Sequence, residues 1–450
     1  MFNKILIANR GEVAVRVART IRAMNIEPVF VYSEQDSLSA YARSGDEFYV
    51  LPGNRVQDTY LNKAAILSIA RRAAVDAIHP GYGLMSEDPG FAESCENEGI
   101  VFIGPHAGAM STMASKLTAR AVAAAQGVPL LPAATVVQVE SGMDELATAI
   151  GYPVVVKAAA GGGGIGMRVV PDGRSLAAAL VDCSATGAAY FGNPEVYIEK
   201  YIAGARHIEA QVLADKHGTI GVIGERECSI QRRYQKFIEE SPAPSLTPDV
   251  RDRIAGYSAR LAAAVGYDSL GTVEYIVDEN GSAYFLEMNT RLQVEHGVTE
   301  AVYGCDLVEQ QIRASFGELL SLSGLSPTGH AIEARIYAED SLTGVPSPGR
   351  LTTFELPFGY DHVRVDSAAA TGDEVSIFYD PLLAKVIAWG KDRPSALVRL
   401  DDALRNTRIE GVKTNLDLGR AVLASDAFAC GEYSTTTAEE VRQRLAIARR

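Results

Sequence analysis

The chain has 450 residues, of which 47% are hydrophobic and 22% charged, and a formal net charge of −14. This length exceeds one hydrophobic core and predicts about two or three domains. The negative charge argues against nucleic acids and anionic membranes as partners, because phosphate groups are bound by basic surfaces. The five scattered cysteines lack zinc or disulfide spacing, and no apolar run is long enough to span a membrane. We therefore expect a cytoplasmic protein with free thiols.

Strands and helices alternate at the start of the chain. The predicted strands are residues 4–8, 27–32 and 76–79, and an amphipathic helix is predicted at about 60–72. This alternation predicts a doubly wound parallel sheet, whose ligands bind beyond the carboxyl ends of the strands. Arg10-Gly11 and the loop of residues 79–87 fall there, although turn chemistry alone also explains the loop. No G-x-G-x-x-G motif is present, which argues against a nicotinamide or flavin cofactor.

A glycine-rich segment follows a short apolar strand that ends at Lys157. It contains four consecutive glycines, residues 161–164, then Gly166 and a strand that begins at Met167. Glycine backbone N–H groups can wrap phosphate oxygens. No Gly-Lys-Ser/Thr sequence closes the segment, and a strand rather than a helix follows it, so it is not a Walker loop. A surface linker would also be glycine-rich, but the adjacent lysine favours a flap that closes over a triphosphate.

A hairpin with opposed carboxylates is predicted further along the chain. A strand over residues 272–277 precedes Asn280-Gly281, a strong hairpin signal. A two-residue turn centred there places Glu274 directly opposite Glu287, an arrangement that is destabilising unless a cation lies between them. Together with Asn289, these oxygen ligands suit Mg²⁺. We predict a metal–phosphate site; the alternative is a pair of exposed glutamates on the wet face of the hairpin.

Polar residues continue past this hairpin. If the chain stays extended, alternate residues share one face. The residues on that face are Glu287, Asn289, Arg291, Gln293 and Glu295. Residues 226–236 form a basic run, for which a solvated surface is the default; beside the hairpin of an acidic chain, we interpret the run as an anion pocket. From about residue 330, strand-like segments, Pro- and Gly-containing turns and a helix at about 393–405 predict a separate α+β domain.

Five motifs occur in an order that resembles biotin carboxylase, a member of the ATP-grasp superfamily. They are Ile7-Ala-Asn-Arg-Gly-Glu12, His79-Pro-Gly-Tyr-Gly83, Glu227-Cys-Ser-Ile-Gln-Arg-Arg233, Glu287-Met-Asn-Thr-Arg-Leu-Gln-Val-Glu-His296 and Pro346-Ser-Pro-Gly349. The resemblance covers essentially the whole chain. It implies a doubly wound α/β domain over residues 1–113, an ATP-grasp domain over 114–330 and an α+β domain over 331–450. The ATP-grasp domain would carry a mobile glycine-rich lid at about residues 131–203, hereafter the lid.

The resemblance also implies a reaction, in which ATP and bicarbonate form carboxyphosphate and biotin is carboxylated. It implies nucleotide contacts at Lys116, Lys157, Gly161, Gly162, Gly163, Gly164, Gly166, Met167, Glu199, Lys200, Ile202, His207 and Gln231. Glu274, Glu287 and Asn289 would bind two Mg²⁺ ions, for which Mn²⁺ can substitute. Bicarbonate would be held by Lys236, Arg291, Gln293 and the backbone of Val294. Glu295 would take its proton, and Arg335 would stabilise the biotin enolate.

The partners follow from the same resemblance. No biotin-attachment sequence of the Met-Lys-Met type occurs, so biotin is expected on a separate carrier protein, and a carboxyltransferase is expected as the second partner. A homodimer is implied, with Arg16 and Arg19 as interface candidates. An acyl-CoA is the expected final acceptor. A urea- or amine-directed carboxylase, an ATP-grasp ligase without biotin, and a non-catalytic scaffold are the alternatives, although a scaffold predicts a broken catalytic residue and none is found.

Four residues depart from the commonest pattern of the family. Ile165 stands where Arg or Lys is usual, Tyr234 replaces His, Gly297 replaces Pro, and Leu84 replaces Phe. None of them is a proposed metal ligand, base or arginine. We therefore expect these departures to affect nucleotide affinity and lid closure more than the reaction itself.

Overall fold

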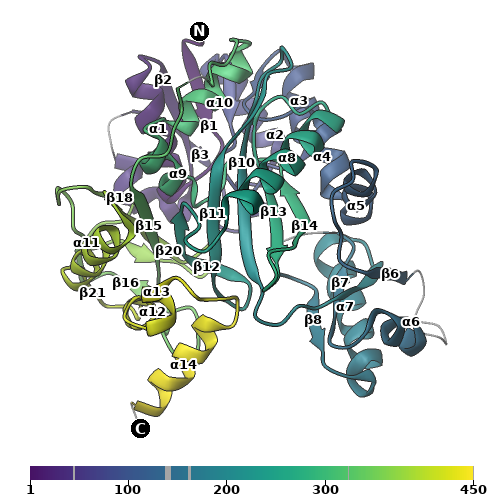
Figure 1. The fold of residues 1–450 in the computed structure, drawn as a ribbon. Coiled ribbons are helices and arrows are strands. Elements are labelled where there is room, and N and C mark those ends of the chain that lie inside the picture. The colour runs from purple at the N-terminus through teal and green to yellow at the C-terminus, as the bar shows by residue number, and fades with distance from the viewer. Residues whose placement is uncertain (44–45, 137–142, 161–163, 323, 449–450) are drawn as a thin grey trace.

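The computed structural model describes residues 1–43, 46–136, 143–160, 164–322 and 324–448. Across these ranges, no helix combines the length and the apolar character needed to cross a membrane. The three larger sheets have five, eight and four strands, and two further sheets have two strands each (Figure 1).

The N-terminal sheet is parallel, with the strand order β3-β2-β1-β4-β5. Its elements and the helices around it are β1 (Lys4–Ile7), α1 (Gly11–Ala23), β2 (Glu27–Ser33), η1 (Glu34–Leu38), η2 (Ala40–Arg43), β3 (Glu47–Leu51), α2 (Lys63–Ala73), β4 (Ala77–His79), α3 (Pro89–Asn97), β5 (Val101–Phe102) and α4 (Ala107–Ala114). Ile5 and Ile7 of β1 pack in one core with α1, whereas Leu6 and Ala8 pack in another with α2 and α3. Helices thus cover both faces, which confirms the predicted doubly wound α/β fold.

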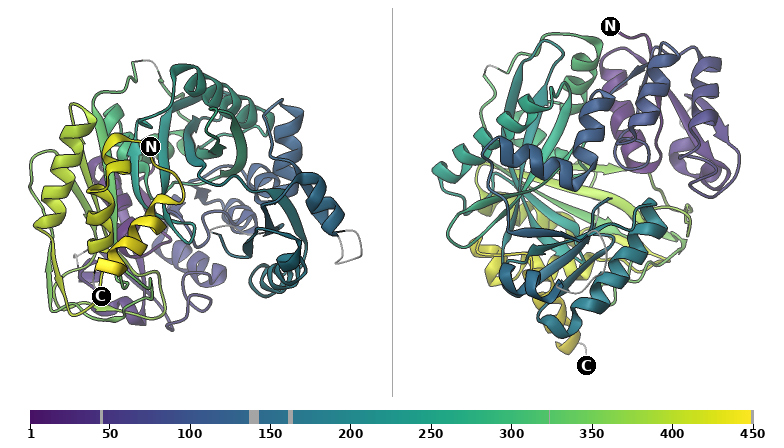
Figure 2. Two further views of the ribbon diagram at one scale, coloured as in Figure 1. Left: turned by 60° about the horizontal axis from the view of Figure 1, so that its bottom comes forward. Right: turned by 90° about the vertical axis from the view of Figure 1, so that its right-hand side faces the viewer.

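The lid contains a four-stranded antiparallel sheet with the order β6-β9-β7-β8. Its elements, together with the helix that precedes it, are α5 (Lys116–Ala125), β6 (Ala133–Val136), α6 (Met143–Ile150), β7 (Val154–Ala158), β8 (Met167–Val170), η3 (Gly173–Ser175), α7 (Leu176–Phe191) and β9 (Val196–Lys200). The glycine segment joins paired strands β7 and β8, as predicted. The lid projects beside the central sheet, apart from the C-terminal helices (Figures 1 and 2).

The central sheet is antiparallel, with the order β14-β13-β10-β11-β12-β15-β20-β18. Its strands are β10 (Arg206–Ala214), β11 (Ile220–Arg232), β12 (Gln235–Ser241), β13 (Leu270–Val277), β14 (Ala283–Asn289), β15 (His330–Tyr337), β18 (Val363–Ser367) and β20 (Leu382–Gly390). Because β12 pairs with β15, the sheet runs without a break into the segment after residue 330. The α+β character predicted there is confirmed, but its strands extend the central sheet instead of forming a separate one.

Helices and short strands complete this part of the molecule. They are α8 (Pro248–Ala264), α9 (His296–Tyr303), α10 (Leu307–Phe316), β16 (Gly349–Arg350), β17 (Thr353–Glu355), β19 (Glu374–Val375), α11 (Arg393–Arg405), β21 (Arg408–Glu410), α12 (Leu416–Leu423), α13 (Asp426–Cys430) and α14 (Thr437–Ala448). Apolar residues of α11, α12 and α14 share one buried core with β12, β15 and β20. The C-terminal helices therefore pack against β12 and β15, and these two strands contribute Lys236 and Arg335 to the cavity described below.

The hairpin of β13 and β14 has the predicted carboxylate pair but not the predicted turn. Glu274 pairs with Glu287, whereas nearer the turn Val277 pairs with Ala283, so the connection is longer than two residues. An irregularity in the pairing beyond Glu274 shifts the register by one residue and leaves Leu286 without a partner in β13. The prediction of a two-residue turn was wrong. The predicted pairing of Glu274 with Glu287 is nevertheless correct, because this bulge compensates for the longer turn.

Candidate active site

A cavity of about 1480 Å³ lies where the lid, the central sheet and the N-terminal domain meet. The predicted site residues that line it are Lys116, Lys157, Gly164, Met167, Glu199, Lys200, Ile202, His207, Gln231, Lys236, Glu274, Glu287, Asn289, Arg291, Gln293, Val294, Glu295 and Arg335. Gly166 is not among the lining residues; a Cβ there would lie 3.0 Å from the Cβ of Ala158, so this glycine permits close packing within the lid. Gly161, Gly162 and Gly163 lie outside the described residues.

Glu274 is surrounded by hydrogen-bond donors and is 2% exposed. Its carboxylate accepts hydrogen bonds from Nζ of Lys236 at 2.9 Å and from Nδ2 of Asn289 at 2.7 Å. Nε2 of His207 lies 2.6 Å from its other oxygen. Burial acts to raise the pKa of Glu274, but Lys236 and His207 outweigh burial, and the pKa is lowered. Glu274 is therefore ionised at neutral pH.

Glu287 has the opposite electrostatic balance. Burial, followed by repulsion from Glu274, raises the pKa of its carboxyl group. A divalent cation between the two carboxylates would remove this repulsion, and Asn289 adds a third oxygen to the set. Carboxylate and amide oxygens are the ligands that Mg²⁺ prefers, so these residues fit a magnesium site.

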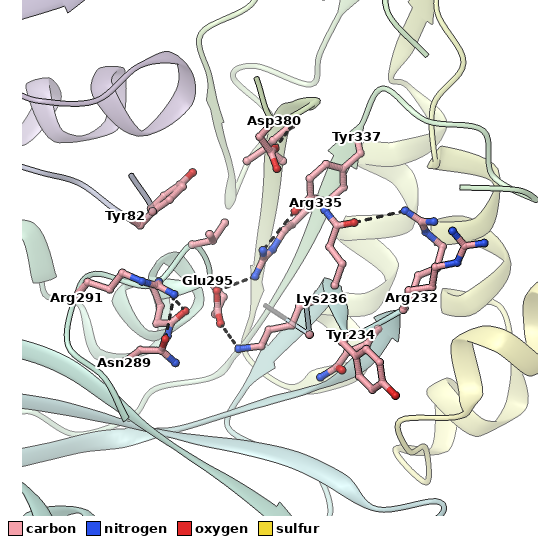
Figure 3. A pocket seen from close by; sticks show the side chains of 18 of the residues that line it. Tyr82, Arg232, Tyr234, Lys236, Asn289, Arg291, Glu295, Arg335, Tyr337 and Asp380 are labelled. Carbon is pink, nitrogen blue, oxygen red and sulfur yellow. Dashed lines mark hydrogen bonds and ion pairs between the residues drawn. The ribbon is translucent and has the colours of Figure 1, made fainter. Parts of the chain in front are cut away.

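Glu295 lies between two cations carried by neighbouring strands of the central sheet. Nζ of Lys236 on β12 is 3.1 Å from Oε1, and Nη2 of Arg335 on β15 is 2.7 Å from Oε2 (Figure 3). Glu295 is 1% exposed. Burial acts to raise its pKa, but Lys236 and Arg335 hold the pKa well below its usual value. The carboxylate is thus ionised and can accept a proton from an anion that the same cations attract.

Arg291 reaches the cavity from a segment that is not a strand. β14 ends at Asn289, so the predicted extended continuation was wrong beyond that residue, although the side chains still converge. Nη2 of Arg291 donates to Oδ1 of Asn289 at 3.0 Å, and Nε donates to Oε2 of Glu87 at 2.8 Å. Gln293 points the same way, with Nε2 at 3.5 Å from Oε1 of Glu274. Glu87 was not predicted as a site residue, although its loop follows β4 at the edge where ligands bind.

The lid side of the cavity has a carboxylate with two cations. Glu199 on β9 forms ion pairs with Lys157 on β7 and with Arg120 on α5. Lys116, at the start of α5, has Nζ at 3.4 Å from a backbone carbonyl of β7, and burial lowers its pKa. Arg120 was not predicted as a site residue, because no motif marks it.

The basic run over residues 226–236 divides into a buried part and a part that faces the cavity. Arg226 is 0% exposed and donates to Glu209 and to Gln211, so it stabilises the sheet interior. The interpretation of the whole run as an anion pocket is corrected in this respect. Lys236 does face the cavity, where it also pairs with Glu209.

Tyr234, one of the four departures from the family pattern, contacts the lid. Arg233 and Tyr234 form the connection between β11 and β12, with φ values of 50° and 70°. A Cβ placed on Gly164 would lie 2.7 Å from the Cβ of Tyr234. The ring of Tyr234 therefore packs against the end of the glycine segment, and the neighbouring Ile165 is 42% exposed.

Gly297, a second departure, lies in the first turn of α9 in close contact with β20. A Cβ there would collide with Cδ1 of Ile387 and lie 3.3 Å from Oε2 of Glu333. Ile387 is 1% exposed, so the space beside this glycine is filled. Leu84, another departure, lines the cavity with a φ of 49°.

Three protein families match successive parts of the chain. The N-terminal domain of biotin carboxylase matches residues 1–110, the ATP-binding domain of carbamoyl-phosphate synthase L chain matches 115–323, and the C-terminal domain of biotin carboxylase matches 333–440. Together they cover all of the residues that line the cavity except Met113 and Ala114.

Whole-length relatives agree with this division. Biotin carboxylase 2 of Bacillus subtilis is 47% identical over 439 residues, which cover 97% of this chain and 98% of that protein. Biotin carboxylase of Halalkalibacterium halodurans is 44% identical over 438 residues, with 97% of each chain covered. The biotin carboxylase domain dimer of Hydrogenobacter thermophilus 2-oxoglutarate carboxylase, solved with MgADP, ADP and bicarbonate, has a TM-score of 0.95 at 40% identity, covering 98% of this chain and 99% of that one. The chain belongs to the biotin carboxylase family and is an ATP-dependent ligase that carboxylates biotin as one component of a biotin-dependent carboxylase.

Proposed function

We propose that the cavity divides the reaction among three groups of residues. Lys116, Lys157, His207, Gln231 and the lid, including Met167, Glu199, Lys200 and Ile202, hold ATP. Glu274, Glu287 and Asn289 hold two Mg²⁺ ions, with Mn²⁺ as a substitute. Lys236, Arg291, Gln293 and the backbone of Val294 hold bicarbonate, Glu295 takes its proton, and Arg335 stabilises the biotin enolate. We also propose the domain boundaries at residues 113/114 and 330/331.

The position of Glu295 carries this proposal. Bicarbonate is a poor nucleophile until it loses its proton, and a base must lie within hydrogen-bond reach of that proton. Glu295 is ionised, and Lys236 and Arg335 contact its two oxygens. Arginine suits a planar anion, because its fork offers two parallel donors and keeps its charge. One carboxylate thus lies between the cation assigned to bicarbonate and the cation assigned to biotin.

The roles are tested by ADP release from the purified chain with Mg-ATP and bicarbonate, with and without free biotin. We expect ADP release that requires bicarbonate and rises when biotin is added. Arg335→Ala should abolish the stimulation by biotin while bicarbonate-dependent ATP cleavage survives in part. Equal loss of both activities in this variant would contradict the separate role of Arg335.

The metal assignment predicts a change in magnesium dependence. Glu274→Gln and Glu287→Gln each remove one charge from the ligand set, so the Mg²⁺ concentration for half-maximal ADP release should rise by about tenfold or more. Titration of each variant with MgCl₂ at saturating bicarbonate measures this shift. An unchanged magnesium requirement in both variants would exclude them as ligands.

We propose that the carrier of biotin and the carboxyltransferase are separate subunits and that an acyl-CoA is the final acceptor. The acceptor is chosen by the carboxyltransferase, so the test is reconstitution with the partner subunits. Carboxylation of acetyl-CoA or propionyl-CoA supports the proposal, whereas turnover of pyruvate, 2-oxoglutarate or urea in their place overturns it.

We further propose a homodimer in which Arg19 contributes to the interface. Arg19 has a side chain that is 50% exposed and pairs with Asp366, whereas Arg16 is 1% exposed and pairs with Glu300 and Asp306. Arg19→Glu should therefore shift the sedimentation coefficient toward the monomer. An unchanged dimer in this variant would place the interface elsewhere.

A further inference from the structure

Arg120 links the two segments through which the lid joins the rest of the chain. It lies one turn after Lys116 on α5, and residues four apart share one face of a helix. Nη2 of Arg120 donates to the backbone carbonyl of Leu131 at 2.7 Å, just before the first lid strand. Nη1 pairs with the carboxylate of Glu199, on the last lid strand. One guanidinium, on the helix above the lid sheet in Figure 1, therefore contacts both the entry and the exit of the lid.

The same carboxylate has a second cation. Lys157 pairs with the other oxygen of Glu199, and the two side chains are 6% and 2% exposed. If Lys157 binds nucleotide phosphates, as proposed above, its ammonium group must leave Glu199 or be shared with the phosphates. A buried carboxylate that loses its cation is strongly destabilised, by about 3–5 kcal/mol when one partner of such a pair is removed.

We propose that Arg120 is a positioning residue for nucleotide binding: it keeps Glu199 paired while Lys157 exchanges from Glu199 to the phosphates, and it fixes the lid at both of its ends. Arginine suits this task because one planar fork serves a carboxylate and a carbonyl at once and never loses its charge. The inference rests on the nucleotide role proposed for Lys157. In the absence of Arg120, Lys157 is the remaining cation of this carboxylate and is held away from ATP.

The experiment is a double-mutant cycle on Arg120 and Glu199, read as KM for ATP and as Kd for ADP. Arg120→Met should raise both constants by about tenfold, while kcat and the KM for bicarbonate change by less than about twofold. Glu199→Gln removes the charge that holds Lys157, so adding Arg120→Met to Glu199→Gln should have little further effect. Equal effects of Arg120→Met in both backgrounds would overturn the proposal.

Three further variants make the outcome specific. Arg120→Lys keeps the charge beside Glu199 but loses the planar fork. Its KM for ATP and Kd for ADP should therefore lie between those of the wild type and Arg120→Met. This variant also tests the proposal if Arg120→Met does not fold. Arg174→Met is the matched control, because Arg174 lies in the lid with a side chain 90% exposed and pairs with Asp172. Lys157→Gln tests the proposed function itself: an unchanged KM for ATP there would contradict the role of Lys157, whereas a raised KM beside an unaffected Arg120→Met would overturn the Arg120 inference alone.

Discussion

Contacts around Glu295 tune the protonation of the residue that we propose as the proton acceptor. Its contacts with Lys236 and Arg335 keep it ionised but also lower its affinity for a proton. In the role proposed for it, such a base would work because the same cations would hold the anion whose proton it receives. The cations thus lower the basicity of Glu295 while they place its carboxylate beside the proposed anion site.

The residue-scale prediction is that Glu295→Gln lowers bicarbonate-dependent ADP release by about a hundredfold or more, the usual contribution of a general base. Glutamine keeps the shape, but its one amide oxygen can accept from only one of the two cations, and it cannot take the proton. Kd for ADP, measured by calorimetry, should stay unchanged and serves as the control for folding. A variant with normal kcat would assign the proton to another acceptor.

His79 gives a second prediction at this scale, concerning stability. Burial, with a smaller contribution from Arg16, lowers the pKa of His79 to about 3, whereas an unfolded histidine titrates near about 6.5. Between these values the unfolded chain binds a proton that the folded chain does not, so stability falls as pH falls below about 6.5. His79 accepts a hydrogen bond from the backbone N–H of Gly81 at 3.0 Å, and asparagine can replace that acceptor.

The variant His79→Asn should therefore lose less stability in acid than the wild type. The difference in unfolding free energy between the two chains should change by about 2 kcal/mol in favour of the variant between about pH 7.5 and about pH 5. Urea denaturation of both chains at the two pH values measures it. Parallel loss in both chains would show that His79 takes up its proton while folded.

Among elements, the hairpin shows what a sequence can and cannot predict. Alternation and the Asn280-Gly281 signal predicted the strands and the opposed carboxylates, which are confirmed. The longer turn and the bulge compensate for each other, and neither leaves a periodic mark in the sequence. Very short strands such as β5, with two residues, also escape prediction, because two residues cannot display alternation.

Contacts between distant segments were missed for a related reason. Arg291 was predicted to lie in the site, but its partner Glu87 is 204 residues away, and Arg120 is 79 residues from Glu199. Local patterns report which face a side chain occupies, not which element will pack against that face. The resemblance to a family identified residues that belong to a motif. It did not identify Glu87 and Arg120, which contact those residues but belong to no motif.

The glycine segment of the lid provides the element-scale prediction. Gly164 has a φ of 77°, and a Cβ there would lie 2.7 Å from the Cβ of Tyr234. Gly164→Ala adds left-handed strain of about 1–2 kcal/mol together with this steric contact, so KM for ATP should rise by about tenfold or more. The matched control is Gly192→Ala, at a φ of 69° with no atom within 4 Å of its Cβ. Equal KM values in the two variants would show that Tyr234 does not constrain the lid.

For the whole molecule, the unbroken central sheet makes the C-terminal segment part of one folding unit. One edge of β12 pairs with β11 and the other edge pairs with β15. Lys385 of β20 forms an ion pair at 3.0 Å with Glu12 of the N-terminal domain. Arg19 also pairs with Asp366 of β18 at 2.8 Å. The segment after residue 330 therefore stabilises both of the preceding domains.

The whole-molecule prediction is that a fragment of residues 1–330 does not fold on its own. It would expose the edge of β12 and the apolar side chains that pack against β15 and β20. Circular dichroism and size-exclusion chromatography of the fragment should show loss of structure or aggregation. A monodisperse fragment with a cooperative thermal transition would mean that the sheet divides into independent units.

The close packing of Gly297 against Ile387 has a consequence for which side chains position 297 accepts. A proline there, the residue that the resemblance leads us to expect, would collide with Ile387 as it is placed here, so position 297 accepts a larger residue only if Ile387 shifts. Gly297→Pro by itself is therefore expected to destabilise the packing of α9 against β20.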